Sequence, residues 1–173
     1  DDRLTTIVVG KGEHQIDGKY LRIASAMNIV GDPGMPKSDL VVVGGISFEE
    51  GIQGNFHLQH LTLRRAKEYG VKGKSSFTMD DVCVEQSGSL GVYAGGTGVA
   101  AKCTNVEVRE CERSGVVAFD GASIALLGTE TKVHHNCTKG YSHDYGLVVV
   151  DSSASAIHLV SPLMKEQVAV DNG

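Results

Sequence analysis

LTLRRAKEYG, residues 61–70, is the first of four segments in this chain that align with one another without gaps. The other three are VCVEQSGSLG (82–91), VEVRECERSG (106–115) and TKVHHNCTKG (131–140). Each segment ends on a glycine, and their first residues, at 61, 82, 106 and 131, are 21, 24 and 25 positions apart. Repeats with a period of about 20–50 residues are typical of solenoids, in which each repeat forms one turn and stacks on its neighbours.

Apolar residues alternate with polar ones inside each repeat, which predicts strands rather than helices. The first and third positions are apolar, as at Leu61 and Leu63, and a period of two is that of a strand with one buried face. The same alternation predicts a second strand just before each segment, five and three residues upstream of its start, at Phe56/Leu58, Phe77/Met79, Ala101/Cys103 and Leu126/Gly128. A third short apolar run follows the closing glycine.

Three short strands per repeat predict an all-β fold: a single-stranded right-handed parallel β-helix of about six to seven turns, each of roughly 20–25 residues. Equivalent strands would then stack in parallel about 4.8 Å apart. We expect one domain over residues 1–173, with irregular turns in 4–54, regular turns in 55–160 and a degenerate end in 161–173. A leucine-rich repeat would need helical segments, and the chain has no long helical periodicity.

Outward-facing residues of successive turns should form columns, and the alignment predicts which residues share one. The fourth positions are Arg64, Glu85, Arg109 and His134, and the fifth are Arg65, Gln86, Glu110 and His135. Charges of mostly alternating sign along a stack support this register. The sixth positions are Ala66, Ser87, Cys111 and Asn136, where we expect Asn136 to hydrogen-bond along the stack.

The alignment can also be extended towards the N-terminus by one turn. In that extension the axis-facing positions are Val41, Val43, Ile46 and Phe48, and the outward columns gain Glu49 and Glu50.

Composition agrees with a narrow coil and excludes two classes of partner. The 173 residues include 22 Gly, no Trp, 5 Tyr and 4 Phe, so Val, Ile, Leu and Ala must fill the interior. With 16 basic and 21 acidic residues and no separate basic cluster, we expect no nucleic-acid binding. No apolar run is long enough to span a bilayer, so we also expect no membrane insertion.

The four cysteines show no Cys-X-X-Cys spacing and no accompanying histidine pattern for zinc. Cys103 is predicted to face the axis and Cys83 to face outward. Cys111 and Cys137 fall on successive turns, near enough for a disulfide to be geometrically conceivable. We favour reduced thiols, which are typical of an intracellular setting.

Over roughly residues 20–160, these repeats and inward apolar pairs resemble right-handed parallel β-helices of the pectate-lyase-like class. The resemblance implies architecture far more than activity. Members that cleave acidic polysaccharides gather carboxylates around Ca²⁺, and the nearest match here is Asp80 with Asp81. Adjacent aspartates before a strand are also ordinary turn formers. We therefore expect no cofactor, with Ca²⁺ at this pair as the alternative.

One neighbourhood is dense in chemically useful side chains. His134, His135, His143 and Asp144 could provide a general base or a zinc site, or they could lie on a solvated face. Tyrosines stack on sugar rings and anchor protein interfaces. The candidate ligand-binding residues are accordingly Tyr141, His143 and Tyr145 of an inserted loop, with Tyr93 and Tyr69 as further candidates.

Three functions remain open from the sequence. The first is a non-catalytic binding module that presents an elongated surface to a glycan or a protein. The second is a polysaccharide-active enzyme, a lyase or epimerase, that uses His134, His135, His143 and Asp144. The third is a structural repeat segment of a larger protein. Open coil ends expose unpaired strand groups, so end-to-end self-association is also expected as an alternative.

Overall fold

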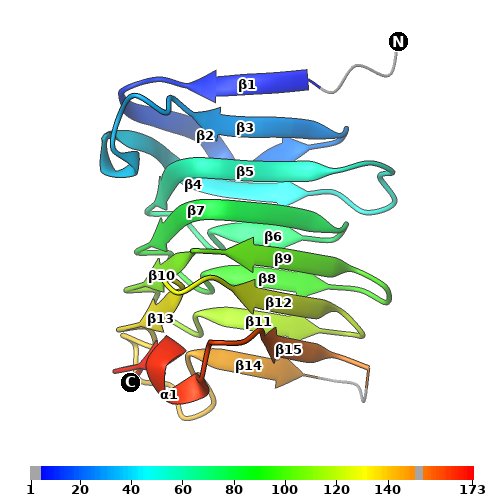
Figure 1. Cartoon of the computed structure of the whole chain (residues 1–173), viewed down its shortest axis with the longest axis vertical. Coiled ribbons are helices and arrows are strands. Elements are labelled where there is room, and N and C mark those ends of the chain that lie inside the picture. The colour runs from blue at the N-terminus through cyan, green and yellow to red at the C-terminus, as the bar shows by residue number, and fades with distance from the viewer. Residues whose placement is uncertain (1–4, 151–153) are drawn as a thin grey trace.

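The computed structural model describes residues 5–150 and 154–173 and is a parallel β-solenoid with almost no helix (Figure 1). Its strands form three stacks, which we call faces A, B and C in the order in which the chain visits them. Face A consists of β1 (Thr5–Val9), β3 (Met27–Gly31), the first halves of β5 (Phe56–Arg64) and β7 (Phe77–Glu85), β9 (Ala100–Thr104), β12 (Ser123–Leu127) and β15 (Ala156–Leu159).

Faces B and C follow in every turn. Face B consists of the first parts of β2 (Gly12–Ile23) and β4 (Leu40–Phe48), the second halves of β5 and β7, β10 (Glu107–Arg109), β13 (Lys132–His134) and β16 (Ala169–Val170). Face C consists of the second parts of β2 and β4, β6 (Val71–Gly73), β8 (Val92–Gly95), β11 (Val116–Phe119) and β14 (Leu147–Val150). The helical segments are η1 (Lys37–Asp39) and α1 (Lys165–Val168). None of the helices in the described part of the chain has the length and apolarity to cross a membrane.

The coil has about five turns, fewer than the six to seven expected. The turns at the two ends are the least regular. Strands β1 and β2 are mostly exposed, and the last turn is interrupted by α1 between β15 and β16.

The predicted register is confirmed through the regular turns. Leu61 pairs with Val82, and the next axis-facing column runs from Leu63 through Val84 and Val108 to Val133. All of these side chains are buried. Phe48 stacks on Phe56 with ring centroids 4.8 Å apart and lies 5.2 Å from Phe77, so aromatic rings fill the core near the N-terminal end.

The predicted alignment is wrong at the strand before the fourth repeat. The pair that stacks on Ala101 and Cys103 is Ile124 and Leu126 rather than Leu126 and Gly128, because the corner after β12 is longer by two residues. Gly128 lies in that corner with a φ of +83°.

The N-terminal extension is shifted by one residue on face B. Val42 pairs with Leu63 and faces the axis, whereas Val41 and Val43 pair with Thr62 and Arg64 on the outside. Glu49 and Glu50 follow Phe48 at the end of face C and therefore do not join the outward columns of face B.

The closing glycines form a column that the fourth repeat joins through Gly146 rather than Gly140. The amide of Val92 donates to the Gly115 carbonyl, and the amide of Val116 donates to the Gly146 carbonyl, each over 2.8 Å. A Cβ on Gly115 would lie 2.5 Å from a methyl of Val133, so only glycine permits this approach. The inserted loop therefore precedes the glycine column instead of following it.

Single residues in the left-handed conformation turn the chain at two corners of the coil. His60, Asp81 and Asn105 have φ between 51° and 53° at the corner between faces A and B. At the next corner, after face B, φ lies between 52° and 56° for Arg65, Gln86, Glu110 and His135. The left-handed conformation is energetically unfavourable for residues other than glycine. Because it recurs at the same position in successive turns, each bend falls in the same place.

Candidate functional site

Catalytic candidates from the sequence are divided between two places. His134 and His135 lie together, with their Nδ1 atoms 2.6 Å apart, and His134 Nε2 lies 2.9 Å from a carboxylate oxygen of Glu107. Asp144 instead accepts hydrogen bonds from Arg113 Nε at 3.0 Å and from Ser114 Oγ at 3.2 Å, and it is buried. The carboxylate beside the histidine pair is thus Glu107, which the sequence reasoning did not select.

The loop before β14 is anchored by Asp144 and presents its tyrosines to solvent. Tyr141 and Tyr145 are 56% and 58% exposed, and the Arg113 guanidinium lies 5.6 Å from the centre of the Tyr141 ring. His143 is exposed on the same loop. The loop can therefore offer aromatic contacts to a partner while its backbone stays fixed by a buried carboxylate.

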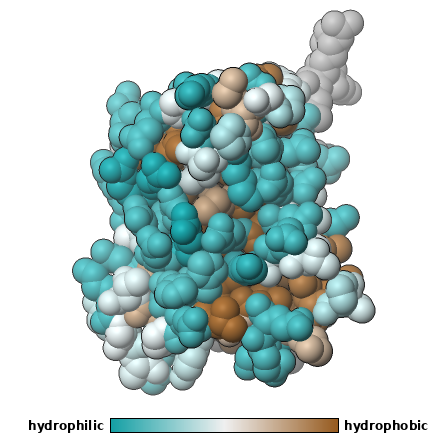
Figure 2. Space-filling model, turned by 60° about the vertical axis from the view of Figure 1, so that its left-hand side comes forward, coloured by the Kyte–Doolittle hydropathy of each residue, from teal (hydrophilic) through white to brown (hydrophobic). Residues whose placement is uncertain are grey.

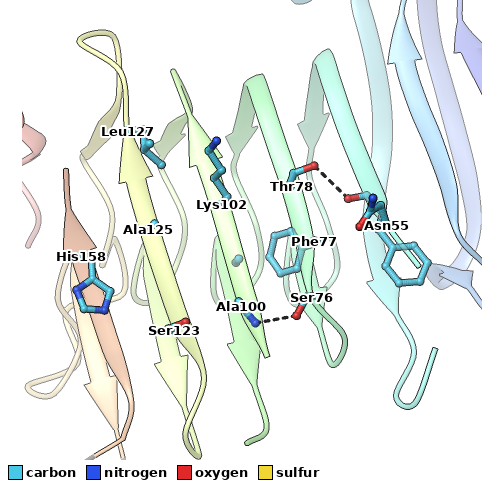
Figure 3. A pocket seen from close by; sticks show the side chains of 12 residues that line it. Asn55, Ser76, Phe77, Thr78, Ala100, Lys102, Ser123, Ala125, Leu127 and His158 are labelled. Carbon is cyan, nitrogen blue, oxygen red and sulfur yellow. Dashed lines mark hydrogen bonds between the residues drawn. The ribbon is translucent and has the colours of Figure 1, made fainter. Parts of the chain in front are cut away.

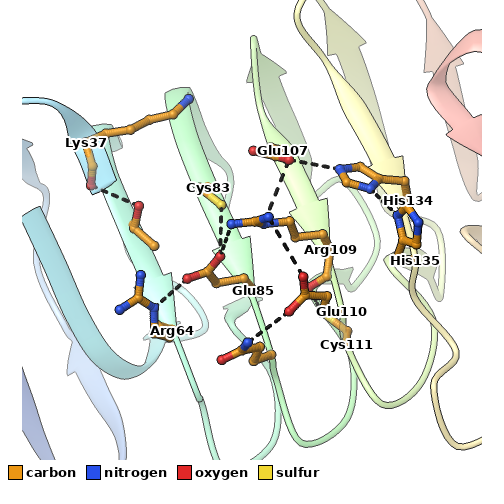
Figure 4. A network of polar contacts seen from close by, with 12 residues as sticks. Lys37, Arg64, Cys83, Glu85, Glu107, Arg109, Glu110, Cys111, His134 and His135 are labelled. Carbon is orange, nitrogen blue, oxygen red and sulfur yellow. Dashed lines mark hydrogen bonds and ion pairs between the residues drawn. The ribbon is translucent and has the colours of Figure 1, made fainter. Parts of the chain in front are cut away.

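Face B carries a continuous polar network (Figure 4). Glu85, whose side chain is only 4% exposed, accepts from Arg64 Nε at 2.5 Å on one side and from Arg109 Nη2 at 2.6 Å on the other. These residues occupy the predicted fourth-position column, which the strand register confirms. Because Glu85 pairs with arginines on both neighbouring turns and Glu107 contacts His134 on the next turn, the network chiefly holds neighbouring turns in register.

The cysteine in this network is covered although it faces outward. Cys83 is 4% exposed, and burial raises the pKa of its thiol to about 12. A thiol with that pKa is a poor nucleophile near neutral pH. Cys103 faces the axis as predicted, and Cys111 and Cys137 are free thiols in the structure.

The two aspartates considered for Ca²⁺, Asp80 and Asp81, occupy different places and have different partners. Asp81 accepts from Lys37 Nζ and from His60 Nδ1, each over 2.6 Å, at the corner between faces A and B. Asp80 lies on the outer side of face A, paired with Gln59 and Thr104. Within residues 5–150 and 154–173, no group of three or more His, Cys, Asp or Glu side chains is placed to hold a metal ion.

The sixth-position column is buried, and it ends in an asparagine pair. Asn136 Oδ1 accepts from the Cys111 amide at 3.1 Å, and its Nδ2 donates to the Val108 carbonyl at 3.0 Å. Asn172 repeats the second bond one turn later, donating to the Val133 carbonyl over 2.9 Å. The predicted hydrogen bonding along the stack is thus confirmed.

Aromatic side chains outside the core gather on one side of the coil. Of the nine aromatic residues, Phe48, Phe56 and Phe77 fill the core. The other six lie on face C or in the loop at its edge: Tyr20, Tyr69, Tyr93, Phe119, Tyr141 and Tyr145.

Four of these rings form a ladder on face C. Tyr93 stacks on Tyr69 with centroids 5.4 Å apart, and Phe119 follows at 6.1 Å. The Tyr69 amide donates to the Tyr20 hydroxyl, and Lys72 Nζ lies 5.7 Å from the centres of both the Tyr20 and the Tyr69 ring. The sequence predicted Tyr93 and Tyr69 as separate candidate ligand-binding residues, but it did not predict that their rings stack in a ladder.

Two depressions flank this ladder and adjoin at Lys74. One, of about 290 Å³, is lined by Lys19, Tyr20, Arg22, Ser47, Glu49, Glu68, Lys72 and Lys74. The other, of about 450 Å³, is lined by Glu50, Gly51, Lys74, Tyr93, Gly95, Gly96, Thr97, Val99, Phe119 and Asp120. Together they extend over five strands, from β2 to β11, or roughly 19 Å at about 4.8 Å per strand.

Face A has a groove with a different lining (Figure 3). Its volume is about 290 Å³, and small outward side chains such as Ala100, Ser123 and Ala125 form much of its surface. Lys102 and His158 lie beside them, and none of the described residues that line the groove carries a carboxylate. Phe56 and Phe77 contribute to its lining, and no tyrosine is among the described residues that line it.

Figure 2 shows a side of the coil covered chiefly by hydrophilic residues, with hydrophobic ones gathered in its lower part towards the C-terminal turns.

Comparison of the chain with protein-family models, with curated proteins and with solved structures found no match.

Proposed function

We propose that this protein is a non-catalytic binding module that holds a glycan chain along face C. The observation that carries the proposal is the placement of all six non-core aromatic residues on this face or in its bordering loop. Aromatic rings beside polar groups suit sugars, whose C–H faces pack on rings and whose hydroxyls hydrogen-bond.

The shape of the face supports a linear ligand. The two depressions share Lys74 and follow the coil axis, so successive sugar units would meet successive turns. Carboxylates and cations both line them, as at Glu49 and Lys72, and can accept from or donate to hydroxyl groups. This placement, together with the resemblance to the pectate-lyase-like class, favours a glycan over a protein partner.

The enzyme alternative has less support. A lyase or epimerase needs a base and further groups around one substrate atom. Here Asp144 is held by Arg113 and Ser114, and His134 pairs with Glu107 inside the network on face B. Neither group faces the depressions of face C.

A panel of neutral and acidic polysaccharides tests the proposal, with melting temperature and absorbance of unsaturated products followed together. A glycan binding module is stabilised by at least one polysaccharide and forms no product. Formation of an unsaturated product identifies a lyase, and a response to none of the panel contradicts glycan binding.

A further inference from the structure

In the part of the chain that the structure describes, large apolar side chains are exposed only near the two ends of the coil. Among the described residues, nine such side chains are exposed, and the regular turns between residues 24 and 140 contribute none of them. They are Ile7, Val8 and Leu21 near the N-terminal end, and Tyr141, Tyr145, Val149, Val150, Val160 and Met164 near the C-terminal end. Exposed apolar surface concentrated in this way marks an interaction surface.

At the N-terminal end, two of these exposed residues belong to the columns that form the core. Ile7 is 44% exposed, whereas its stacking partner Ile29 is 3% exposed. Leu21 is 38% exposed, whereas its partner Ile46 is fully buried.

The C-terminal end shows the same contrast. Val149 is 49% exposed and stacks on Ala118, which is fully buried. The core is thus open at both ends of the coil.

The strands at these ends also have free edges. Among the described strands, β1 pairs only with β3 and β2 only with β4, while β14 pairs only with β11 and β15 only with β12. A free edge is a template for another strand. At the C-terminal end, Val168 of α1 is buried against the core beside β13, so faces A and C remain the open part (Figure 1).

We propose that the C-terminal end of one copy stacks on the N-terminal end of a second copy, with β15 beside β1 and β14 beside the second part of β2. All strand pairs in the coil are parallel, and head-to-tail stacking alone continues parallel pairing. Two like ends would meet with antiparallel strands. The core columns continue across this junction, placing Leu159 on Ile7 and Leu147 on Leu21.

Such a contact is heterologous, so it can repeat and produce open chains of copies. It does not depend on glycan binding, because face C lies along the side of the coil. Sedimentation velocity of the wild-type chain should be measured without glycan. The weight-average molecular mass should increase with protein concentration between about 1 and 500 μM, the range in which contacts of micromolar affinity form.

Two charge variants separate the ends. Leu21→Lys places an ammonium group in the N-terminal surface, and Val149→Lys does so in the C-terminal surface, so each should weaken association at least about tenfold. Mixed in equal amounts, the two variants retain one compatible pair of ends and should form a dimer but nothing larger. Val150→Lys is the matched control, because Val150 pairs with the outward-facing Phe119.

Thermal unfolding by circular dichroism confirms that each variant is folded, and Leu21→Asn with Val149→Asn replaces any lysine variant that is not. A wild-type chain that stays monomeric over the whole range overturns the proposal. So does self-association of either end variant alone at the wild-type concentration, which would indicate contact between like ends. Equal loss of association in Val150→Lys also overturns it.

Discussion

Arg109 and Glu85 occupy directly paired positions on neighbouring turns, and the guanidinium donates to the carboxylate over 2.6 Å on the outside of the coil. Arg64 approaches the same carboxylate from the preceding turn. The side chain of Glu85 is nevertheless only 4% exposed, because the two arginines cover it. One carboxylate therefore links three consecutive turns.

Glu85→Gln should lower the free energy of unfolding by about 2–3 kcal/mol. The amide keeps the shape but removes the buried charge that the two guanidinium groups share. Arg64 then keeps only the exposed Glu13, and Arg109 keeps Glu107 and Glu110 at the longer distance of 3.8 Å, so the loss of this shared partner is costly. Urea unfolding followed by circular dichroism measures the change.

Glu13→Gln is the control for that variant. Glu13 also pairs with Arg64 and Arg65, but its side chain is 53% exposed, so the loss should stay below about 1 kcal/mol. Equal effects of the two substitutions would show that the buried carboxylate does not link the turns.

Gly115→Ala should destabilise the coil by more than about 2 kcal/mol. The added Cβ would lie 2.5 Å from a Val133 methyl and 2.8 Å from the Gly146 carbonyl oxygen, and backbone must move to relieve this overlap. Gly10→Ala, where no atom lies within 4 Å, should be nearly neutral. A stable Gly115→Ala chain would mean that the glycine column is not close-packed.

His60 should make stability depend on pH. Its Nδ1 donates to Asp81 and its Nε2 to the Met35 carbonyl, so both nitrogens carry protons and the pKa of His60 is raised above 6.5. A raised pKa means that the stabilisation is complete below about pH 6.5 and is lost as the pH rises through the folded-state pKa. Unfolding measured from pH 5 to 9 should show this loss.

His60→Gln should remove most of that pH dependence, whereas His57→Gln should leave it, because His57 contacts Thr78 and no carboxylate. Asp81 acts in a different pH range. Burial raises the pKa of its carboxyl, but hydrogen bonds from Lys37 and His60 outweigh burial and hold it below 3.8. Its contribution is therefore lost only in stronger acid. A wild-type loss between pH 6.5 and 9 that survives in His60→Gln would contradict this assignment.

The repeats made the coil and its columns predictable. The pairing of Arg64, Glu85, Arg109 and His134 follows from alignment alone, because equal repeat positions occupy equal places in each turn. Alignment without gaps fails where corners differ in length. It misplaced the strand before Val133 by two residues, and it selected Gly140 where Gly146 joins the column.

The aromatic ladder could not be found in the same way. Tyr69 precedes a closing glycine, Tyr93 follows one, and Tyr20 lies in an irregular turn, so no column of the alignment contains them all. Their meeting depends on how long side chains lean across neighbouring strands. Counting aromatics at outward positions after the closing glycine would have detected part of the ladder.

Tyr93→Ala should weaken glycan binding about five- to tenfold, since the loss of ring contact costs roughly 1 kcal/mol or somewhat more. Lys72→Ala should also weaken it, because Lys72 lies in the first depression between two tyrosines. Lys102→Ala on face A is the matched control and should bind normally. Calorimetric titration of the polysaccharide that stabilises the wild type measures all three, and weaker binding only in Lys102→Ala would move the site to face A.

Backbone amide NMR shifts during titration with that polysaccharide test the proposed binding face most directly. The largest shifts should fall on residues of face C, around Tyr20, Tyr69, Lys72 and Tyr93, and extend along several turns. Shifts confined to face A or face B, or to one turn, would contradict a glycan laid along this ladder.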